Sequence, residues 1–290
     1  MSWPPARPAS PVPLRKLAGG AALPALGFGT WELREATARA VRHALDTGYR
    51  HIDTARAYQN EPAVGAALAA SGVPRDDAWI TSKAWCDDLS AAGIQRQAEA
   101  SLRDLNTDYL DLFLIHWPNE AFDLAETLAG FQQLVSDGKI RHFGVSNFTA
   151  AQWQTAVALA PEIITNQVEY HPLLAQTELL AAARLHRACL TAYAPLARGR
   201  LFLPGEPASE VLGAIAAELS KTPAQIVLRW LIEQPEVVAI PASRDPRHIE
   251  ENFQIFDFQL TGTQRAAINQ LACGQRLVHP SWSPAEWSLG

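Results

Sequence analysis

Lysine and cysteine are both scarce in this sequence of 290 residues, and basic residues are fewer than acidic ones. The 30 acidic side chains outnumber the 24 basic ones, which gives a net charge of −6 at pH 7. Nucleic-acid-binding proteins carry a basic surplus, so we expect no nucleic-acid partner. The three cysteines form no C-x-x-C pair, which argues against a disulfide framework and favours a reducing compartment. Twenty of the cations are Arg, and the four lysines are Lys16, Lys83, Lys139 and Lys221.

Long hydrophobic runs are also missing. The most apolar stretches, such as residues 62–73, are well short of the ~20 residues that cross a bilayer. The N-terminus, M-S-W-P-P-A-R-P-A-S-P-V-P, lacks the apolar core of a signal peptide. We therefore expect a cytoplasmic protein with no membrane partner. Hydrophobic residues make up 48% of the chain and charged residues 19%, a balance typical of a folded protein with a large core.

From residue 25 onward, short apolar runs alternate with longer stretches of helical period. Strands are expected at 25–31, 50–54, 78–83, 109–116, 142–146, 163–168, 189–194 and 237–241. Helices are expected at 34–47, 60–71, 90–105, 125–138, 149–160, 177–187, 209–233 in two pieces, and 246–255. Eight βα units without a flexible linker predict an α/β protein, a (β/α)8 TIM barrel, as one domain over residues 1–290. A Gly-Gly turn predicts a short N-terminal hairpin at 13–22, and residues 274–290 are expected to form an irregular tail.

The alternative fold is an open doubly wound sheet that binds a dinucleotide. Such a sheet normally carries a G-x-G-x-x-G turn after its first strand. Gly27 and Gly29 supply the first two glycines, but Glu32 stands at the third position. The incomplete motif favours the barrel.

Three consecutive strands end in polar residues at the carboxyl face, where barrels of this kind carry their active sites. These residues are Asp53, Lys83 and His116, and Tyr58 follows in the loop after Asp53. Each one has a structural explanation when taken alone: a turn cap, a solvated lysine, a core histidine. Together they form a set that can donate a proton, because a close cation lowers the pKa of a tyrosine and a carboxylate holds that cation in place. Arginine is a wide planar fork instead of a point charge, which gives a reason for a lysine at position 83 in an arginine-rich chain.

Six motifs then identify a resemblance. They are G-Y-R-H-I-D-T-A-R-A-Y (48–58), T-S-K (81–83), L-I-H-W-P (114–118), G-V-S-N-F (144–148), N-Q-V-E-Y-H-P (166–172) and A-Y-A-P-L-A-R-G (192–199). In this order they resemble the aldo-keto reductases, and particularly the compact bacterial 2,5-diketo-gluconate and methylglyoxal reductases. The resemblance implies a barrel that binds a nicotinamide dinucleotide and reduces aldehydes and ketones to alcohols.

The resemblance also assigns roles to individual residues. It implies that Tyr58 is the general acid, that Lys83 and Asp53 tune it, and that His116 orients the carbonyl. The implied cofactor contacts are Thr30, Asp53, Ser146, Asn147, Gln167, Tyr193 and Leu196, and further along the chain Ser243, Arg244, His248, Glu251 and Asn252. The implied substrate wall consists of Trp31, Trp85 and Trp117 beside His116. No metal is implied.

One segment departs from the family pattern. The family's last strand reads I-P-K-S, followed by an Arg six residues after the Lys, and both cations hold the 2′-phosphate of NADP. Ala242 and His248 stand at these two positions here. We therefore expect NADPH as the favoured cofactor by a small margin, with NADH as a second cofactor.

The connecting segments over the rim are short, which predicts an open pocket for a small carbonyl substrate. From the resemblance we also expect a monomer. Two other functions fit parts of the pattern. A metal-dependent barrel hydrolase would use His and Asp at the same rim, but no strand carries an H-x-H pair. A non-catalytic barrel that binds the cofactor for redox sensing or as a scaffold would not need the complete set of Asp53, Tyr58, Lys83 and His116.

Overall fold

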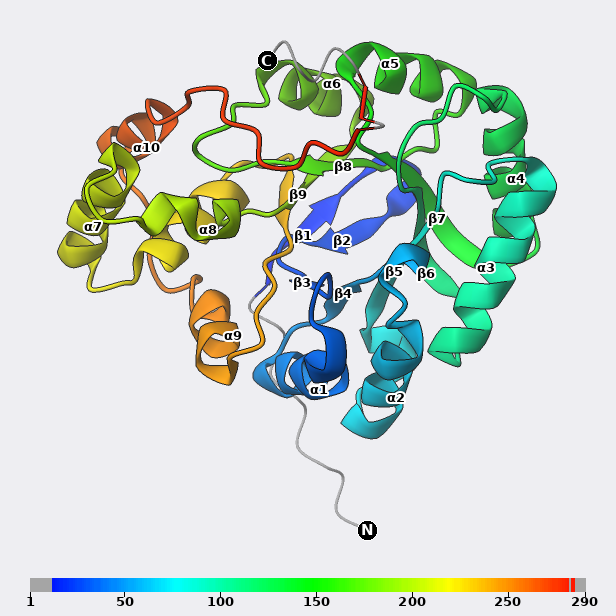
Figure 1. Ribbon diagram of the computed structural model, residues 1–290, viewed down its shortest axis with the longest axis horizontal. Helices are drawn as coiled ribbons and strands as arrows, with labels where there is room; N and C mark the ends of the chain where they lie inside the picture. The colour runs from blue at the N-terminus through cyan, green and yellow to red at the C-terminus, as the bar shows by residue number, and fades with distance from the viewer. Residues whose placement is uncertain (1–11, 282, 285–290) are drawn as a thin grey trace.

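The computed structural model describes residues 12–281, 283 and 284, so both ends of the predicted domain, and part of the predicted tail, lie outside the described residues. In this part of the chain, eight parallel strands pair in sequence order (Figure 1). They are β3 (Phe28–Gly29), β4 (His51–Asp53), β5 (Trp79–Ala84), β6 (Leu110–Ile115), β7 (Ile140–Ser146), β8 (Thr165–Glu169), β9 (Cys189–Tyr193) and β10 (Val237–Ala239). The predicted (β/α)8 barrel is confirmed, and the single domain over 1–290 stays a prediction.

The first and last strands meet and close the barrel. Leu26 forms a parallel bridge with Ala239 beside β3 and β10. A Cβ atom on Gly29 would lie 2.9 Å from the carbonyl oxygen of Ile240, so glycine permits the close approach of the two strands at this seam. The strand expected over 25–31 is only two residues long, because this part of the chain pairs through an isolated bridge in place of a continuous ladder.

Helices alternate with the strands and surround the barrel (Figure 1). They are α1 (Thr37–Thr47), α2 (Glu61–Ser71), α3 (Ala91–Leu105), α4 (Leu124–Ser136), α5 (Ala150–Leu159), α6 (Thr177–His186), α7 (Pro207–Leu219), α8 (Pro223–Glu233), α9 (Pro246–Phe253) and α10 (Gly262–Asn269). Capping boxes at Thr149, Thr222 and Thr261 start three of them, because each hydroxyl accepts a hydrogen bond from a backbone N–H of the first turn. Only α10 was not predicted, and its one buried residue, Ile268, leaves almost no apolar period to detect.

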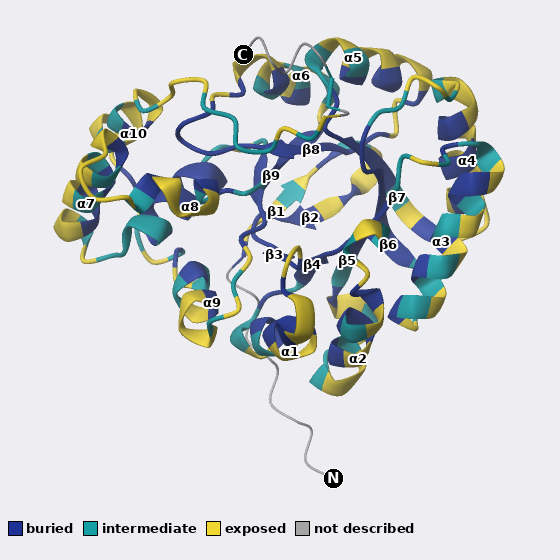
Figure 2. Ribbon diagram, in the orientation of Figure 1, coloured by how far each residue is buried: buried dark blue, intermediate teal, exposed yellow. Residues whose placement is uncertain are grey.

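Most residues of the eight barrel strands are buried, with Arg141 of β7 an exposed exception, while the helices are buried on one side (Figure 2). Every residue of β6 and of β8 is buried. This pattern explains why a strand such as β6 reads as a nearly continuous apolar run, since both faces of a parallel sheet are covered.

A hairpin of β1 (Leu14–Lys16) and β2 (Ala22–Pro24) closes the end of the barrel at which the strands begin. Leu17 and Leu23 pack in one cluster with Leu112 of β6. The guanidinium of Arg15 donates to the carbonyl of Val237, the first residue of β10, at 2.9 Å. The hairpin predicted over 13–22 therefore exists and extends to residue 24.

Among the described residues, no single helix is long and apolar enough to cross a membrane. The pair α7 and α8 passes the length and composition test only when both helices are taken together, and an 89° bend separates them. Residues of both, including Leu212 and Leu228, are buried in the core.

Candidate active site

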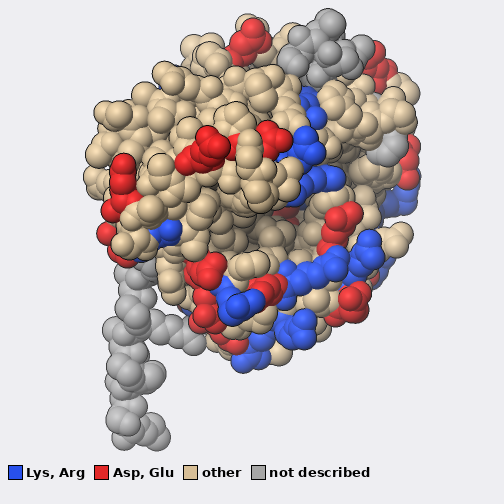
Figure 3. Space-filling model, turned by 60° about the vertical axis from the view of Figure 1, so that its left-hand side comes forward, with Lys and Arg blue, Asp and Glu red and all other residues tan. Residues whose placement is uncertain are grey.

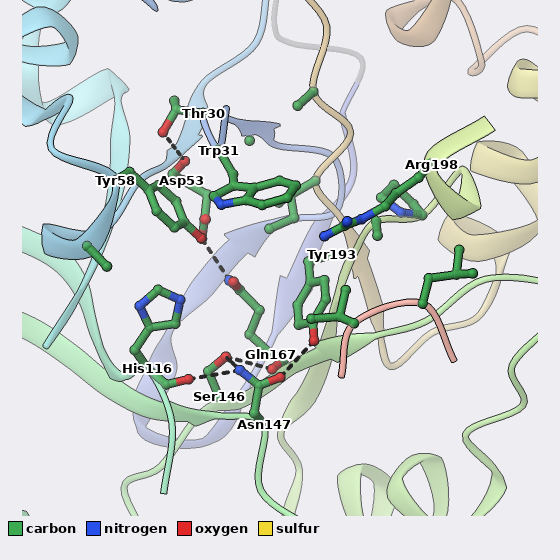
Figure 4. Close-up of a pocket in the computed structure, with 18 of the residues that line it drawn as sticks. Thr30, Trp31, Asp53, Tyr58, His116, Ser146, Asn147, Gln167, Tyr193 and Arg198 are labelled. Atoms are coloured by element: carbon green, nitrogen blue, oxygen red, sulfur yellow. Dashed lines mark hydrogen bonds between the residues drawn. The ribbon is translucent and has the colours of Figure 1, made fainter. Parts of the chain in front are cut away.

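A cavity of about 870 Å³ opens at the carboxyl ends of the strands (Figure 4). Its walls come from loops after β3, β4, β5, β6, β7, β9 and β10 and from residues near the C-terminus. Most of the site residues expected from the sequence lie in this lining: Thr30, Trp31, Asp53, Tyr58, Trp85, His116, Trp117, Ser146, Asn147, Gln167, Tyr193 and Leu196. Lys83 lies directly behind them.

Lys83, on β5, contacts both Asp53 at the end of β4 and Tyr58 in the loop that follows β4. Its ammonium donates to Asp53 Oδ1 at 2.5 Å, to the carbonyl of Thr54 at 2.8 Å and to the hydroxyl of Tyr58 at 3.4 Å. The side chain of Lys83 is completely buried, with 0% exposed. The parallel register places Asp53 beside Thr81, two residues before Lys83, so the barrel itself brings the pair together.

Burial sets the protonation of this group. It raises the pKa of Tyr58 well above the usual range, and the charge of Asp53 adds to the effect. Burial also lowers the pKa of Lys83, which Asp53 opposes. The net lowering of the Tyr58 pKa that we expected from Lys83 is not found, because burial and the charge of Asp53 raise this pKa. Tyr58 therefore keeps its proton at neutral pH.

His116 packs against Tyr58 and Trp85 at the wall of the cavity. Its ring meets the ring of Tyr58 at 5.5 Å and that of Trp85 at 5.2 Å between centroids, both edge to face. Burial, together with the charge of Lys83, lowers the pKa of His116 well below its usual value. The ring is thus a neutral imidazole, and its Nδ1 atom is buried without a hydrogen-bond partner among the described residues.

Gln167, on β8, connects Asp53 to the opposite wall. Its amide donates to Asp53 Oδ2 at 2.7 Å, so both oxygens of this carboxylate are held. The hydroxyl of Ser146 donates to the backbone carbonyl of Gln167 at 2.8 Å. These bonds fix a row of amide and hydroxyl groups along the cavity floor (Figure 4).

Asn147 occupies the turn that follows β7. Its φ of 65° is a left-handed conformation, which asparagine tolerates better than most residues. Its amide donates to the carbonyl of His116 at 2.9 Å, and its Oδ1 accepts from the hydroxyl of Tyr193 at 2.9 Å. The second bond holds the Tyr193 ring upright as a flat wall of the cavity (Figure 4).

The predicted contacts on β10 and α9 are only partly at the cavity. Ala242 lines it, whereas Ser243, Arg244, His248, Glu251 and Asn252 lie on the next turn and on α9, outside the lining. The guanidinium of Arg244 donates to the carbonyl of Glu32, in the loop after β3, at 3.0 Å. His248 is exposed, and Asn252 is buried.

Sequence reasoning missed two parts of the lining. Arg198 lines the cavity, with its guanidinium 4.5 Å from the ring centre of Trp31. Residues 277–280, part of the predicted irregular tail, also line the cavity. The apolar pair Leu277 and Val278 is the one sequence signal that they touch something, but nothing in the sequence states where the tail returns. The expected open pocket is therefore walled by the tail on one side.

The described residues contain no group of three or more His, Cys, Asp or Glu side chains that could hold a metal ion. The carboxylate of Asp53 is instead bonded to an ammonium and an amide.

A sequence profile described as the Aldo/keto reductase family matches residues 25–272, most of the chain and the whole barrel. This chain belongs to the aldo/keto reductase family. The resemblance stated from the six motifs is thereby confirmed.

Among similar aldo/keto reductases, the methylglyoxal reductase DkgA of Yersinia pestis is 42% identical over 91% of this chain and 95% of its own length. The methylglyoxal reductase DkgB of Escherichia coli O157:H7 is 39% identical over 92% of this chain and 99% of its own length. The crystal structure of a candidate 2,5-diketo-D-gluconic acid reductase B superposes with a TM-score of 0.88, at 40% identity over 94% of this chain and 97% of that one. An aldo-keto reductase of Bombyx mori, solved in complex with NADP, gives a TM-score of 0.86 at 33% identity, over 96% and 97% of the two chains.

Proposed function

We propose that this aldo/keto reductase reduces small aldehydes and ketones to alcohols with NADPH. The observation that carries the proposal is the buried contact of Lys83 with Asp53 and Tyr58, which opens into the cavity beside His116. The NADP complex of the Bombyx mori relative and the methylglyoxal reductases among the bacterial relatives support the cofactor and the reaction.

The residues present fit a nicotinamide dinucleotide. Ser146, Asn147 and Gln167 offer hydroxyl and amide groups for a carboxamide, and the flat ring of Tyr193 offers a stacking surface beside them. A cavity of about 870 Å³ is within the usual range for a ligand site. A bound reduced nicotinamide supplies a hydride to the carbonyl carbon of the substrate.

The chain itself supplies the proton. The hydroxyl of Tyr58 donates it to the carbonyl oxygen, and the raised pKa of the phenol ensures that the proton is present at neutral pH. As the proton leaves, negative charge develops on the Tyr58 oxygen, 3.4 Å from the Lys83 ammonium. Lys83 stabilises this charge, and Asp53 fixes the direction of Lys83.

His116 orients the substrate in this proposal. Because its pKa is lowered, it remains a neutral hydrogen-bonding group and adds no charge beside Lys83. Trp31, Trp85 and Trp117 form apolar walls on the substrate side. These walls favour small carbonyl compounds, and we propose a cytoplasmic monomer as the working form.

Cofactor selection is weaker here than in relatives that carry both cations. Ala242 and His248 provide no permanent positive charge for a 2′-phosphate, and Arg244 is the nearest replacement, bonded to Glu32. On the face drawn in Figure 3, basic side chains are interspersed with acidic ones, so no broad positive field replaces the lost pair there. We therefore propose NADPH as the favoured cofactor, with NADH also accepted.

The test is a panel of aldehydes and ketones, assayed by the loss of reduced-nicotinamide absorbance with each cofactor. Tyr58→Phe should lower kcat by at least a hundredfold while the dissociation constant of NADPH changes less than twofold, since general acid catalysis contributes about 10²–10⁴ in rate. Tyr109→Phe is the matched control, because the Tyr109 hydroxyl bonds the exposed Asp76 and Tyr109 does not line the cavity. Full activity in Tyr58→Phe would remove the proposed acid, and binding of NADPH without turnover of any carbonyl would indicate a sensing or scaffold protein.

A further inference from the structure

The segment that follows α10, residues 273–280, returns to the barrel and lies against the candidate active site. Figure 1 shows it as the red stretch of irregular chain that runs from α10 toward β8. It has no helix or strand of its own, yet Leu277, Val278, His279 and Pro280 all line the cavity. We call residues 273–280 the C-terminal segment.

Glu169, the last residue of β8, holds this segment with both oxygens of its carboxylate. Oε1 accepts from the backbone N–H of Leu277 at 2.8 Å, and Oε2 accepts from that of Val278 at 2.9 Å. His171 Nε2 contacts Oε1 at 2.9 Å. The side chains of Glu169 and His171 are both completely buried, with 0% exposed. Two consecutive backbone donors therefore meet one buried anion.

A buried carboxylate is expensive to maintain unless its partners compensate. Burial by itself raises the pKa of Glu169, but the bonds from His171, Leu277 and Val278 outweigh it, and the pKa lies below the ordinary value. The carboxylate is therefore charged at neutral pH, and its bonds to the segment are charge-assisted, the stronger kind of hydrogen bond.

The first residues of the C-terminal segment are anchored to the loop that follows β8. The backbone N–H groups of Cys273 and Gln275 both donate to the carbonyl of Leu173 at 3.1 Å. These anchors precede the residues that line the cavity, whereas the two bonds to Glu169 are made by lining residues themselves. The position of the cavity wall therefore depends most directly on Glu169.

We propose that Glu169 is a positioning residue that sets the substrate-binding wall of this enzyme by clamping Leu277 and Val278 over the cavity. The inference rests on the proposed function for its effect on substrate, but the clamp itself is a property of the fold. Glu169 lies at the end of the strand that also carries Gln167, two residues earlier, so the wall and the cavity floor are held by one rigid element.

Glu169→Gln tests the clamp with almost no change in volume. A glutamine has one oxygen and one NH₂ group, so one of the two backbone N–H groups would face a donor and lose its bond. Hydrogen exchange followed by NMR or mass spectrometry should show the amides of residues 277 and 278 exchanging about tenfold faster or more, the ratio that corresponds to one charge-assisted bond. The KM for a carbonyl substrate should rise about tenfold with kcat within twofold, because the lost wall contributes to ground-state and transition-state binding alike.

Glu233→Gln is the matched control. The Glu233 carboxylate also accepts from a backbone N–H, that of Leu260 at 3.0 Å, but this residue is not in the cavity lining. It should leave the KM and the exchange of residues 277 and 278 unchanged. Should Glu169→Gln fail to fold, Val278→Pro removes one donor from the segment's side without altering the buried strand. Position 278 then has no amide to exchange, so the expected changes are faster exchange of the Leu277 amide and the same rise in KM.

Two results would overturn the proposal. One is unchanged exchange of the clamped amides, at residues 277 and 278 in Glu169→Gln or at residue 277 in Val278→Pro, and the other is faster exchange with an unchanged KM. Loss of the proposed function would be seen separately, as a wild-type protein that turns over no carbonyl compound. The exchange measurement would then still decide whether Glu169 clamps the segment.

Discussion

Replacing Lys83 by methionine should cost far more stability than replacing any surface lysine of this chain. Methionine matches the length of the lysine stem, so the change removes the charge with little change in packing. It leaves Asp53 buried with one remaining side-chain bond, from Gln167 at 2.7 Å. Breaking a buried pair in this way typically costs about 3–5 kcal/mol, mostly because the remaining charge is uncompensated.

If the uncompensated charge of Asp53 causes most of the lost stability, a double variant that also removes this charge tests the explanation. In Lys83→Met with Asp53→Asn, the uncompensated charge is gone, so the loss should be smaller than the sum of the two single losses by about 2–3 kcal/mol. The assay is equilibrium unfolding in urea at pH 7 for the wild type, both single variants and the double variant. Lys221 and Asp257 provide the matched cycle, since their ion pair has a similar length, 2.7 Å, with the Asp257 side chain 67% exposed.

The exposed cycle should give a coupling energy of only about 0.2–1 kcal/mol. A coupling energy for Lys83 and Asp53 in that same range would refute the reasoning, because it would mean that burial adds nothing to the pair. Lys83→Arg should also be unable to replace the lysine, since a planar fork does not fit among Asp53, Thr54 and Tyr58. Recovery of full stability in Lys83→Arg would contradict the explanation given for this lysine.

Two further predictions concern cofactor choice and acid stability. The ratio of kcat/KM with NADPH to that with NADH should be modest, and Ala242→Lys should raise it about ten- to a hundredfold by adding a charge-assisted bond; a wild-type ratio in the thousands would contradict the argument. Burial lowers the pKa of His51 to about 4, so as the pH falls below the usual histidine value of 6.5 the unfolded chain takes up a proton that the folded protein does not. His51 should therefore cost on the order of 3 kcal/mol of stability between pH 6.5 and pH 4, and His51→Gln should flatten the pH dependence of urea unfolding in that interval.

Most of the fold follows from the sequence because each element carries its own signal. Apolar runs such as residues 110–115 are buried on both faces, and α1 buries Val41, Ala44 and Leu45 on one side, so period and length identify them. The exceptions have weak local signals. The helix α10 buries one residue, and β3 is shortened at the seam where the barrel closes.

The candidate site could be predicted as far as strand ends determine it. Asp53, Lys83 and His116 end consecutive parallel strands, so the topology alone brings them together. The pKa of Tyr58 could not be predicted, because it depends on burial and on the position of the Asp53 charge, which only the geometry gives. Leu277 and Val278 are more than 100 residues from Glu169 in the chain. The hydrophobic periodicity of a sequence identifies helices and strands but does not predict contacts over such a separation.

The N-terminal hairpin and the side chains packed inside the barrel close the end opposite the cavity. Leu17 and Leu23 fill this end, and the cavity at the other end is lined both by residues proposed to hold the cofactor and by residues proposed to hold the substrate. Ligands therefore enter and leave by one mouth. We therefore expect the ligand that lies deeper in the cavity to bind first and leave last.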